Sequence, residues 1–347
     1  MDTSSFFRVD GMVAVITGGG TGIGFHMAKA LANAGAKKVY ILARRQELLV
    51  EAAKAHESLH PVVCDVGSKE SLQAAVEVIT KESGYVNLVI ANSGVVGPVA
   101  RFHPDLSLSE LRQRLYDDVS MDDFTQTMHI NVTGAYFTML AFLELLDAGN
   151  KNAVKGGFGA PLTEGSDVPS IQSQVLFISS IAAYSRSYFS LPAYAGSKSA
   201  IEHLAKHAST NLSQHGIRVN AMAPGLFPTE LGRGLIEGRD PSTEHHSELR
   251  YIPARRFGGE EEMAGSVLYL ASRAGAVSIP TSCFPSHYNY FRERESTGFP
   301  PCSSFSMSSK HSQNAEKAST NLWASKYCNG TVLVNDGGKL ANMPSAY

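Results

Sequence analysis

Short apolar runs alternate with longer stretches of helical periodicity along most of the chain. Seven runs are apolar at nearly every position, at 12–17, 38–43, 61–66, 87–92, 174–179, 218–223 and 331–335. Strands covered by helices on both faces have this continuous pattern, whereas half-exposed strands alternate. Helices are predicted at 22–35, 68–82, 124–147, 193–215 and 260–272. The alternation predicts a doubly wound α/β fold with one mainly parallel sheet, and it predicts ligands at the carboxyl ends of the strands.

The helix predicted at 193–215 has the clearest amphipathic pattern. Its apolar stripe consists of Ile201, Leu204, Ala205, Ala208 and Leu212. Gly216 follows the stripe, and glycine is the usual residue just beyond a helix C-terminus. We therefore expect this helix to pack on the sheet and to end near residue 215.

Three stretches are longer than ordinary connections. Residues 98–118 and 149–173 interrupt the pattern near the middle of the chain, and we expect both to be surface excursions. The third stretch, 277–326, holds twelve serines in fifty positions and shows no helix or strand period. Its composition predicts an unstructured insertion within a single domain.

Composition and charge exclude several classes of protein. The chain has 347 residues, a formal charge of −2 and 18% charged residues, so there is no basic excess for nucleic acid. No apolar stretch reaches the ~18 residues of a membrane span, and the N-terminus lacks the pattern of a secretory signal. The four cysteines include no CxxC pair. A reduced, cytoplasmic location is the simplest expectation.

A glycine-rich turn follows the first predicted strand and opens a helix. It reads TGGGTGIG, with the spacing Gly18-xxx-Gly22-x-Gly24 around Thr21 and Ile23. Glycines let the backbone approach a diphosphate, and the free N–H groups at a helix N-terminus favour anions. A turn of this kind without a phosphate is the alternative.

Tyr194 stands four residues before Lys198 at the start of a predicted helix. Side chains at i and i+4 lie on one helix face, so the phenol and the ammonium can lie close together. Such a pair can act as an acid with a cationic neighbour. The spacing also occurs by chance, and the remaining motifs must decide its meaning.

The full series of motifs resembles the short-chain dehydrogenase/reductase family, which has a Rossmann-type fold. After TGxxxGxG come Asn92-Ser93-Gly94, Asn131, Ser180, Tyr194-xxx-Lys198 and Pro224-Gly225-xxx-Thr229, in that order and each near a strand end. The resemblance covers residues 7–276 and 327–338, which leaves out the serine-rich segment.

The resemblance implies catalytic roles for four residues. Tyr194 would give a proton to a substrate carbonyl while a nicotinamide delivers hydride, and Lys198 would lower the pKa of the phenol and bind the nicotinamide ribose. Ser180 would hold the substrate oxygen, with Ser179 as the competing choice. Asn131 would tie a water to Lys198. The alternative for Asn131 is a buried structural amide.

The end of the second strand favours NADP(H) as cofactor. Ala43 stands where an acidic residue would bind the ribose of NAD, and Arg44 and Arg45 follow where a 2′-phosphate would lie. The alternative is that both arginines merely solvate a helix start. Thr21 occupies a position at which many NADP-using relatives are basic. The resemblance implies that Asp65 faces the adenine, that Asn92 lies near the adenine ribose, and that Phe227 and Thr229 flank the nicotinamide. It also implies cofactor contacts from Gly94 and from Gly18, Thr21, Gly22, Ile23 and Gly24 of the turn.

The serine-rich segment interrupts the family pattern. Joining Ala276 to Tyr327 gives the usual passage from the last helix to the last strand, and 297 residues would remain. Val277-Ser278 and Thr320-Asn321 can be encoded by bases resembling a splice donor and a branch point. We therefore hypothesise that 277–326 is a retained intron, with a specialised loop as the rival. Either way we expect an irregular loop carrying Trp323, the single tryptophan.

These features together predict an NADP(H)-dependent oxidoreductase that interconverts a carbonyl and a secondary alcohol. The stretches ANSG and IPARRFGG resemble the ketoreductase branch that acts on acyl- or polyketide-like compounds. An NAD-linked alcohol or steroid dehydrogenase is one alternative, and a catalytically inert nucleotide-binding protein is another.

His203 and His207 have the spacing of a zinc pair, but the glutamate of an HExxH motif is missing, so no metal is expected. The family resemblance implies a homodimer or homotetramer.

Overall fold

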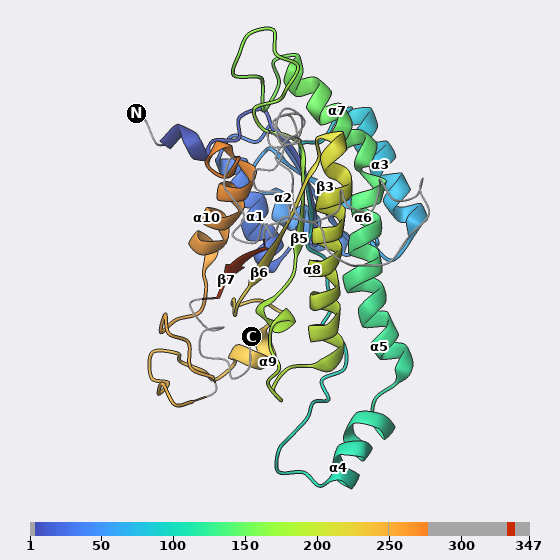
Figure 1. The fold of residues 1–347 in the computed structure, drawn as a ribbon, viewed down its shortest axis with the longest axis vertical. Helices are drawn as coiled ribbons and strands as arrows, with labels where there is room; N and C mark the ends of the chain where they lie inside the picture. The colour runs from blue at the N-terminus through green and yellow to red at the C-terminus, as the bar shows by residue number, and fades with distance from the viewer. Residues whose placement is uncertain (1–3, 249, 277–331, 337–347) are drawn as a thin grey trace, which may run out of the picture.

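A seven-stranded parallel sheet forms the centre of the molecule (Figure 1). The computed structural model describes residues 4–248, 250–276 and 332–336. The strand order is β3-β2-β1-β4-β5-β6-β7, and every neighbouring pair is parallel. The predicted doubly wound Rossmann-type fold is confirmed. The strands are β1 (Val13–Thr17), β2 (Lys38–Ala43), β3 (Leu59–Val63), β4 (Leu88–Ala91), β5 (Gln174–Ile178), β6 (Arg218–Pro224) and β7 (Val332–Asn335).

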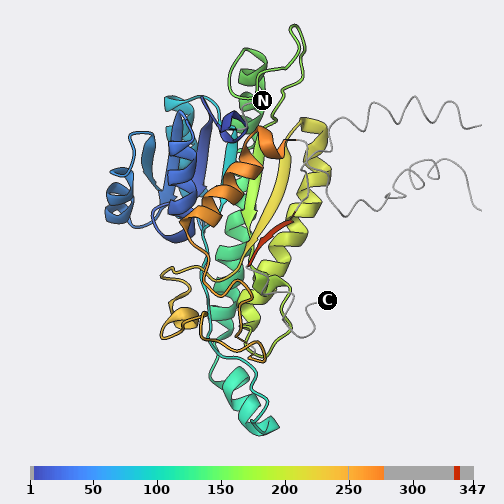
Figure 2. The ribbon, with the colours of Figure 1, turned by 90° about the vertical axis from the view of Figure 1, so that its left-hand side faces the viewer.

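Helices cover both faces of the sheet (Figure 2). The α-helices in the described part of the chain are α1 (Gly22–Asn33), α2 (Gln46–Ala53), α3 (Lys69–Glu82), α4 (Leu108–Arg112), α5 (Met121–Met128), α6 (Ala135–Ala141), α7 (Leu143–Val154), α8 (Pro192–Leu212), α9 (Arg233–Ile236) and α10 (Glu260–Ala271). Side chains of α1, α2 and α10 join one buried cluster, and those of α3, α6, α7 and α8 join the other.

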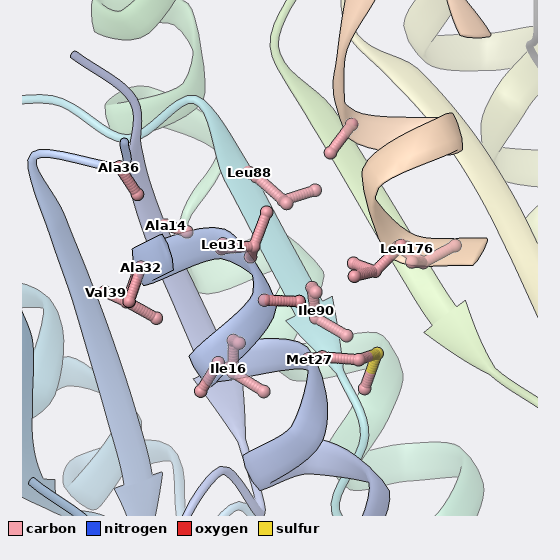
Figure 3. Close-up of a cluster of buried hydrophobic side chains, with 14 of the residues drawn as sticks. Ala14, Ile16, Met27, Leu31, Ala32, Ala36, Val39, Leu88, Ile90 and Leu176 are labelled. Atoms are coloured by element: carbon pink, nitrogen blue, oxygen red, sulfur yellow. The ribbon is translucent and has the colours of Figure 1, made fainter. Parts of the chain in front are cut away.

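Alternate residues of each strand enter the two clusters. On β1, Ala14 and Ile16 pack with Met27 and Leu31 of α1, whereas Val13 and Val15 face the second cluster. Figure 3 shows Ile16, Met27 and Leu31 in this packing. Burial on both faces explains why the strands are apolar at nearly every position.

The third strand starts and ends earlier than its hydrophobic run suggested. The prediction was 61–66, but β3 spans Leu59–Val63 and pairs only with β2. Cys64 and Val66 are buried beyond the end of the strand. Pro61 is tolerated because β3 is an edge strand, where a missing N–H breaks no ladder.

The predicted helix 124–147 is the main error in the secondary structure. The chain forms α5, a π-helical turn at His129–Gly134, α6 and, after a break at Phe142, α7. A Cβ on Gly134 would lie 3.0 Å from the carbonyl oxygen of Val66, so the helix passes very close to the neighbouring backbone there. The excursion expected from residue 149 begins only after Val154, where α7 ends. Periodicity could not detect these breaks because the apolar pattern continues through them.

Helix α8 matches its prediction closely. Ile201, Ala205 and Ala208 are buried, while Leu204 and Leu212 pack partly exposed against the same cluster. Gly216 has a φ of +65°, in the left-handed region, and ends the helical stretch as expected.

The last strand is held to the rest of the fold by Asn335. Its Nδ2 donates to the carbonyl oxygen of Glu262 at 3.2 Å and to Ser266 Oγ at 2.9 Å, both on α10.

The hypotheses about 277–326, including the retained intron and the loop carrying Trp323, lie outside the described residues. Among the described residues, no single helix is long and apolar enough to cross a membrane, although the bent pair Met121–Ala141 and Leu143–Val154 passes by length and composition.

Two helical glycines give a matched test of this packing. A Cβ on Gly149 in α7 would lie 2.2 Å from the carbonyl oxygen of Val86, whereas a Cβ on Gly265 in α10 would meet nothing within 4 Å. We expect Gly149→Ala to lower the urea midpoint, because the overpacking cost of about 1–3 kcal/mol or more exceeds the gain in helix propensity. Gly265→Ala should leave the midpoint unchanged or raise it. Equal midpoints for the two variants would contradict the close approach of α7.

Candidate active site

The glycine-rich turn adopts a backbone that only glycine accommodates easily. Gly18 and Gly22 have φ values of +65° and +56°. A Cβ on Gly24 would lie 2.3 Å from the carbonyl oxygen of Gly18 and 2.5 Å from Asn92 Nδ2. Thr21 is the N-cap of α1, but its side chain caps no N–H group. The first N–H groups of α1, which begins at Gly22, are therefore free of a side-chain cap, and the turn fits a cofactor diphosphate.

Asn92 fixes this turn to the neighbouring strand. Its Nδ2 donates to the carbonyl oxygens of Thr17 and Gly18 at 2.9 and 3.2 Å. The backbone N–H groups of Asn92 and Ser93 both donate to Thr17 Oγ1, at 3.0 and 3.1 Å. The amide of Asn92 thus holds the ends of β1 and β4 together, and its contact with a cofactor ribose stays a prediction.

The two arginines after β2 lie in different surroundings. Arg44 is exposed, and no carboxylate of the described residues lies within ion-pair distance of it. Arg45 donates to Glu230 at 3.2 Å, in an ion pair whose side chains are both more than half exposed. Arg44 is therefore the better placed of the two to receive an anionic group. Asp65, predicted to face the adenine, accepts the N–H of Gly67 at 2.9 Å.

Ser180 and Tyr194 meet at the carboxyl end of β5. Ser180 follows the strand and accepts the N–H of Ala182 at 3.1 Å, while Tyr194 lies in the first turn of α8. Burial raises the pKa of the Tyr194 phenol, and hydrogen bonding by the neighbouring Ser180 hydroxyl lowers it in part.

Lys198 lies beside the same phenol, one turn further along α8. Its Nζ is 5.6 Å from the centre of the Tyr194 ring and donates to the carbonyl oxygen of Ile178 at 2.8 Å. Burial lowers the pKa of Lys198 to about 8. The lowered phenol pKa expected from the sequence is not found in the protein alone, because the burial of Tyr194 outweighs the effect of its neighbours.

The structure separates the two candidate serines. Ser179 is buried, with its Oγ 2.8 Å from Glu202 Oε1 and 3.1 Å from the carbonyl oxygen of Lys198. It therefore points into α8, whereas Ser180 contacts Tyr194. Sequence reasoning missed Glu202, whose pKa is raised by burial and which also hydrogen-bonds Tyr184. Its position on the buried face of α8, four residues after Lys198, was the available signal.

Asn131 lies on the π-helical turn and is almost fully paired with protein groups. Its Oδ1 accepts the N–H of Val95 at 2.8 Å, and its Nδ2 donates to the carbonyl oxygen of Val95 at 2.9 Å and to Ser197 Oγ at 3.0 Å. The Asn131 side chain thus acts as a buried structural amide, which was the alternative interpretation of this residue. A Cβ on Gly94 would lie 3.1 Å from Asn131 Oδ1 and 3.6 Å from Lys198 Nζ, so both atoms border the space next to Gly94. A water tie from Asn131 to Lys198 stays a prediction.

The loop after β6, residues 226–258, reaches back to the glycine-rich turn. A Cβ on Gly22 would lie 3.2 Å from Thr229 Cγ2. Phe227 is buried, and its ring packs so closely against Gly258 that a Cβ there would lie 2.5 Å from it. Thr229 therefore adjoins the predicted cofactor site, while the Phe227 side chain stabilises the base of the loop.

Known proteins resemble this chain along most of its length. The family model described as short chain dehydrogenase matches residues 12–154, and the model described as Enoyl-(Acyl carrier protein) reductase matches residues 163–279. Short-chain dehydrogenase/reductase SAT3 of Stachybotrys chartarum is 53% identical, over 92% of this chain and 100% of its own.

Solved structures show the same fold at lower identity. A Pseudomonas aeruginosa RhlG/NADP active-site complex is 22% identical, with a TM-score of 0.65, and covers 96% of this chain and 98% of its own. A 7α-hydroxysteroid dehydrogenase complexed with NADH is 21% identical, with a TM-score of 0.65, and covers 97% of this chain and 98% of its own. The sequence match over nearly the whole chain decides the family: this protein belongs to the short-chain dehydrogenase/reductases and is an oxidoreductase.

Proposed function

We propose that this chain is an NADP(H)-dependent reductase that converts a ketone to a secondary alcohol. The observation that carries the proposal is the Ser180 hydroxyl next to the Tyr194 phenol, with Lys198 beside the same ring, at the carboxyl end of β5. A bound nicotinamide would supply the hydride. Side chains of this chain would bind the substrate oxygen and supply the proton.

Tyr194 is suited to give a proton to a substrate oxygen. Because burial raises the pKa of its phenol, Tyr194 is protonated at neutral pH, which is the form that reduction requires. The Ser180 hydroxyl lies next to the Tyr194 phenol and would bind the same substrate oxygen as charge develops on it. Hydride adds to the carbonyl carbon, the Tyr194 proton goes to the oxygen, and the C=O bond becomes C–OH.

The preference for the phosphorylated cofactor rests on Arg44 and Ala43. Ala43 provides no carboxylate for an unmodified ribose, and Arg44 is exposed just after β2, where the carbonyl oxygen of Leu42 accepts the N–H of Gly18 in the glycine-rich turn at 2.6 Å. A guanidinium is well matched to a phosphate because its planar fork donates two parallel hydrogen bonds. An acyl- or polyketide-like substrate, suggested by the ANSG and IPARRFGG stretches, is part of the proposal.

Replacing Tyr194 tests the proton donor. Tyr194→Phe should reduce the rate of NADPH oxidation with a ketone panel by about a hundredfold or more, because general acid catalysis contributes that much. NADPH affinity, measured by calorimetry, should change little. Tyr116→Phe is the matched control, since Tyr116 is 71% exposed on the α4 excursion, and it should keep full activity. A fully active Tyr194→Phe variant would reject the mechanism.

The pKa of Lys198 predicts a pH dependence of kcat/KM for NADPH. Its pKa of about 8 means that the ammonium is present below that pH and is lost as the pH rises through it. We expect kcat/KM for NADPH to fall above a pH of about 8, because this parameter reports the ionisation of the free enzyme. Lys198→Arg should move the fall to higher pH, since a guanidinium stays protonated. An identical profile for both proteins would show that another group controls the fall.

Replacing Arg44 tests the proposed preference for NADPH over NADH. Arg44→Ala should weaken NADPH binding by about tenfold or more and leave NADH binding nearly unchanged, because only NADPH carries the 2′-phosphate. Arg45→Ala should have a smaller effect, since Arg45 is paired with Glu230. Calorimetric titration of both cofactors measures these changes. Equal losses for NADH and NADPH would argue for a general effect on the site.

A further inference from the structure

Three loops from distant parts of the sequence meet at Phe189. The phenyl ring stacks on Tyr188, with 4.5 Å between ring centres, and both belong to the connection between β5 and α8. His103 lies edge-on to Tyr188 at 6.1 Å. The guanidinium groups of Arg101 and Arg250 lie 5.6 and 5.5 Å from the centre of the Phe189 ring. We call these five residues the Phe189 cluster.

The cluster lies in the segments that surround the candidate active site. Phe189 precedes Tyr194 by five residues and lies three residues before Pro192, where α8 begins. Arg101 belongs to the excursion after β4, and Arg250 belongs to the 226–258 loop. Both loops extend beyond the same end of the sheet (Figures 1 and 2). The cluster therefore gathers the loops that follow β4, β5 and β6, where ligands bind in this type of fold.

The two arginines bring positive charge to the cluster without a carboxylate partner. Within the described residues, no acidic side chain lies within ion-pair distance of Arg101 or Arg250. The neighbouring acidic groups have other partners. Glu230 pairs with Arg45, Glu244 with Arg239, Asp105 with His103, and the carboxylates of Asp240 and Glu248 accept the N–H groups of Ser242 and His245.

The contacts with the ring leave the arginine donors available. Within the described residues no hydrogen bond from the guanidinium of Arg101 or Arg250 is found, and a guanidinium beside a ring can still donate its N–H groups to another partner. Arg239 donates to the carbonyl oxygen of Arg250 at 2.8 Å, and the Arg239 side chain is itself held by Glu244. The backbone that carries Arg250 is thereby fixed, which lowers the entropy cost of binding a ligand there.

We propose that the Phe189 cluster binds an anionic group of the substrate, so that the enzyme selects ketones carrying a carboxylate and an apolar or aromatic body. This inference rests on the proposed reductase function and specifies its substrate class. Arg101 and Arg250 would bind the carboxylate, and the exposed parts of the Tyr188 and Phe189 rings would contact the apolar body. Neither arginine takes part in the transfer of hydride or proton.

The experiment compares keto acids with their neutral esters. Benzoylpropionate, benzoylbutyrate and benzoylvalerate, each paired with its methyl ester, vary the distance between ketone and charge. For the preferred length we expect kcat/KM for the acid to exceed that for the ester by about tenfold or more, as a charge-assisted contact allows. Added salt should reduce the preference because it screens the attraction.

Substitutions test whether the Phe189 cluster causes the preference for acids over esters. Arg101→Gln and Arg250→Gln should each reduce the ratio of acid to ester several-fold, and the double variant should abolish it while ester turnover stays near wild type. Arg250→Lys should keep a salt-sensitive part of the preference, because charge remains but the planar fork is lost. Arg273→Gln removes an exposed arginine after α10 and should leave the ratio unchanged.

The two proposals fail in different ways. If no ketone is turned over, the reductase function is wrong, and calorimetric binding of the same acids and esters still tests the cluster. A double variant that folds, as judged by circular dichroism, and keeps the acid preference would overturn the inference. Equal binding of acids and esters by the wild type, or no binding of any acid, would overturn it as well.

Discussion

A buried lysine is the constraint around which the candidate active site is organised. Lys198 is 4% exposed, although an ammonium loses favourable hydration when it leaves water. Within the described part of the chain its ammonium makes one hydrogen bond, to the carbonyl oxygen of Ile178, and burial lowers the pKa to about 8. The lysine is therefore held close to its ionisation point, where a small change in surroundings alters its charge.

The polar groups around Lys198 fix the backbone on either side of it. Ser179 joins the end of β5 to the Lys198 carbonyl and to Glu202, and Asn131 joins the chain after β4 to Ser197. These buried bonds connect the ends of β4 and β5 to one helix. They bring Ser180 and Tyr194 together with little freedom, which is what a proton transfer over hydrogen-bond distance requires.

The surrounding loops are built differently from this rigid centre. Many of their contacts are stacked rings, guanidinium groups over rings, and surface ion pairs such as that between Arg45 and Glu230, although Arg239 and Glu244 form a nearly buried pair. Exposed pairs of this kind are individually weak, at about 0–1 kcal/mol. Loops held mainly by such contacts can vary without disturbing the candidate catalytic residues.

Local sequence determined the parts of this protein that depend on short-range chemistry. The buried strands, the glycine-rich turn and the Tyr194-Lys198 pair were predictable. Burial on both faces, positive φ and helical spacing each produce a recognisable sequence pattern within a few residues. Tertiary structure alone decided that Ser180 rather than Ser179 meets Tyr194, that the helix near Asn131 breaks into a π-turn, and that Arg101 and Arg250 reach the same ring. These outcomes depend on which distant backbones approach one another, and neither hydrophobic period nor motif order contains that information.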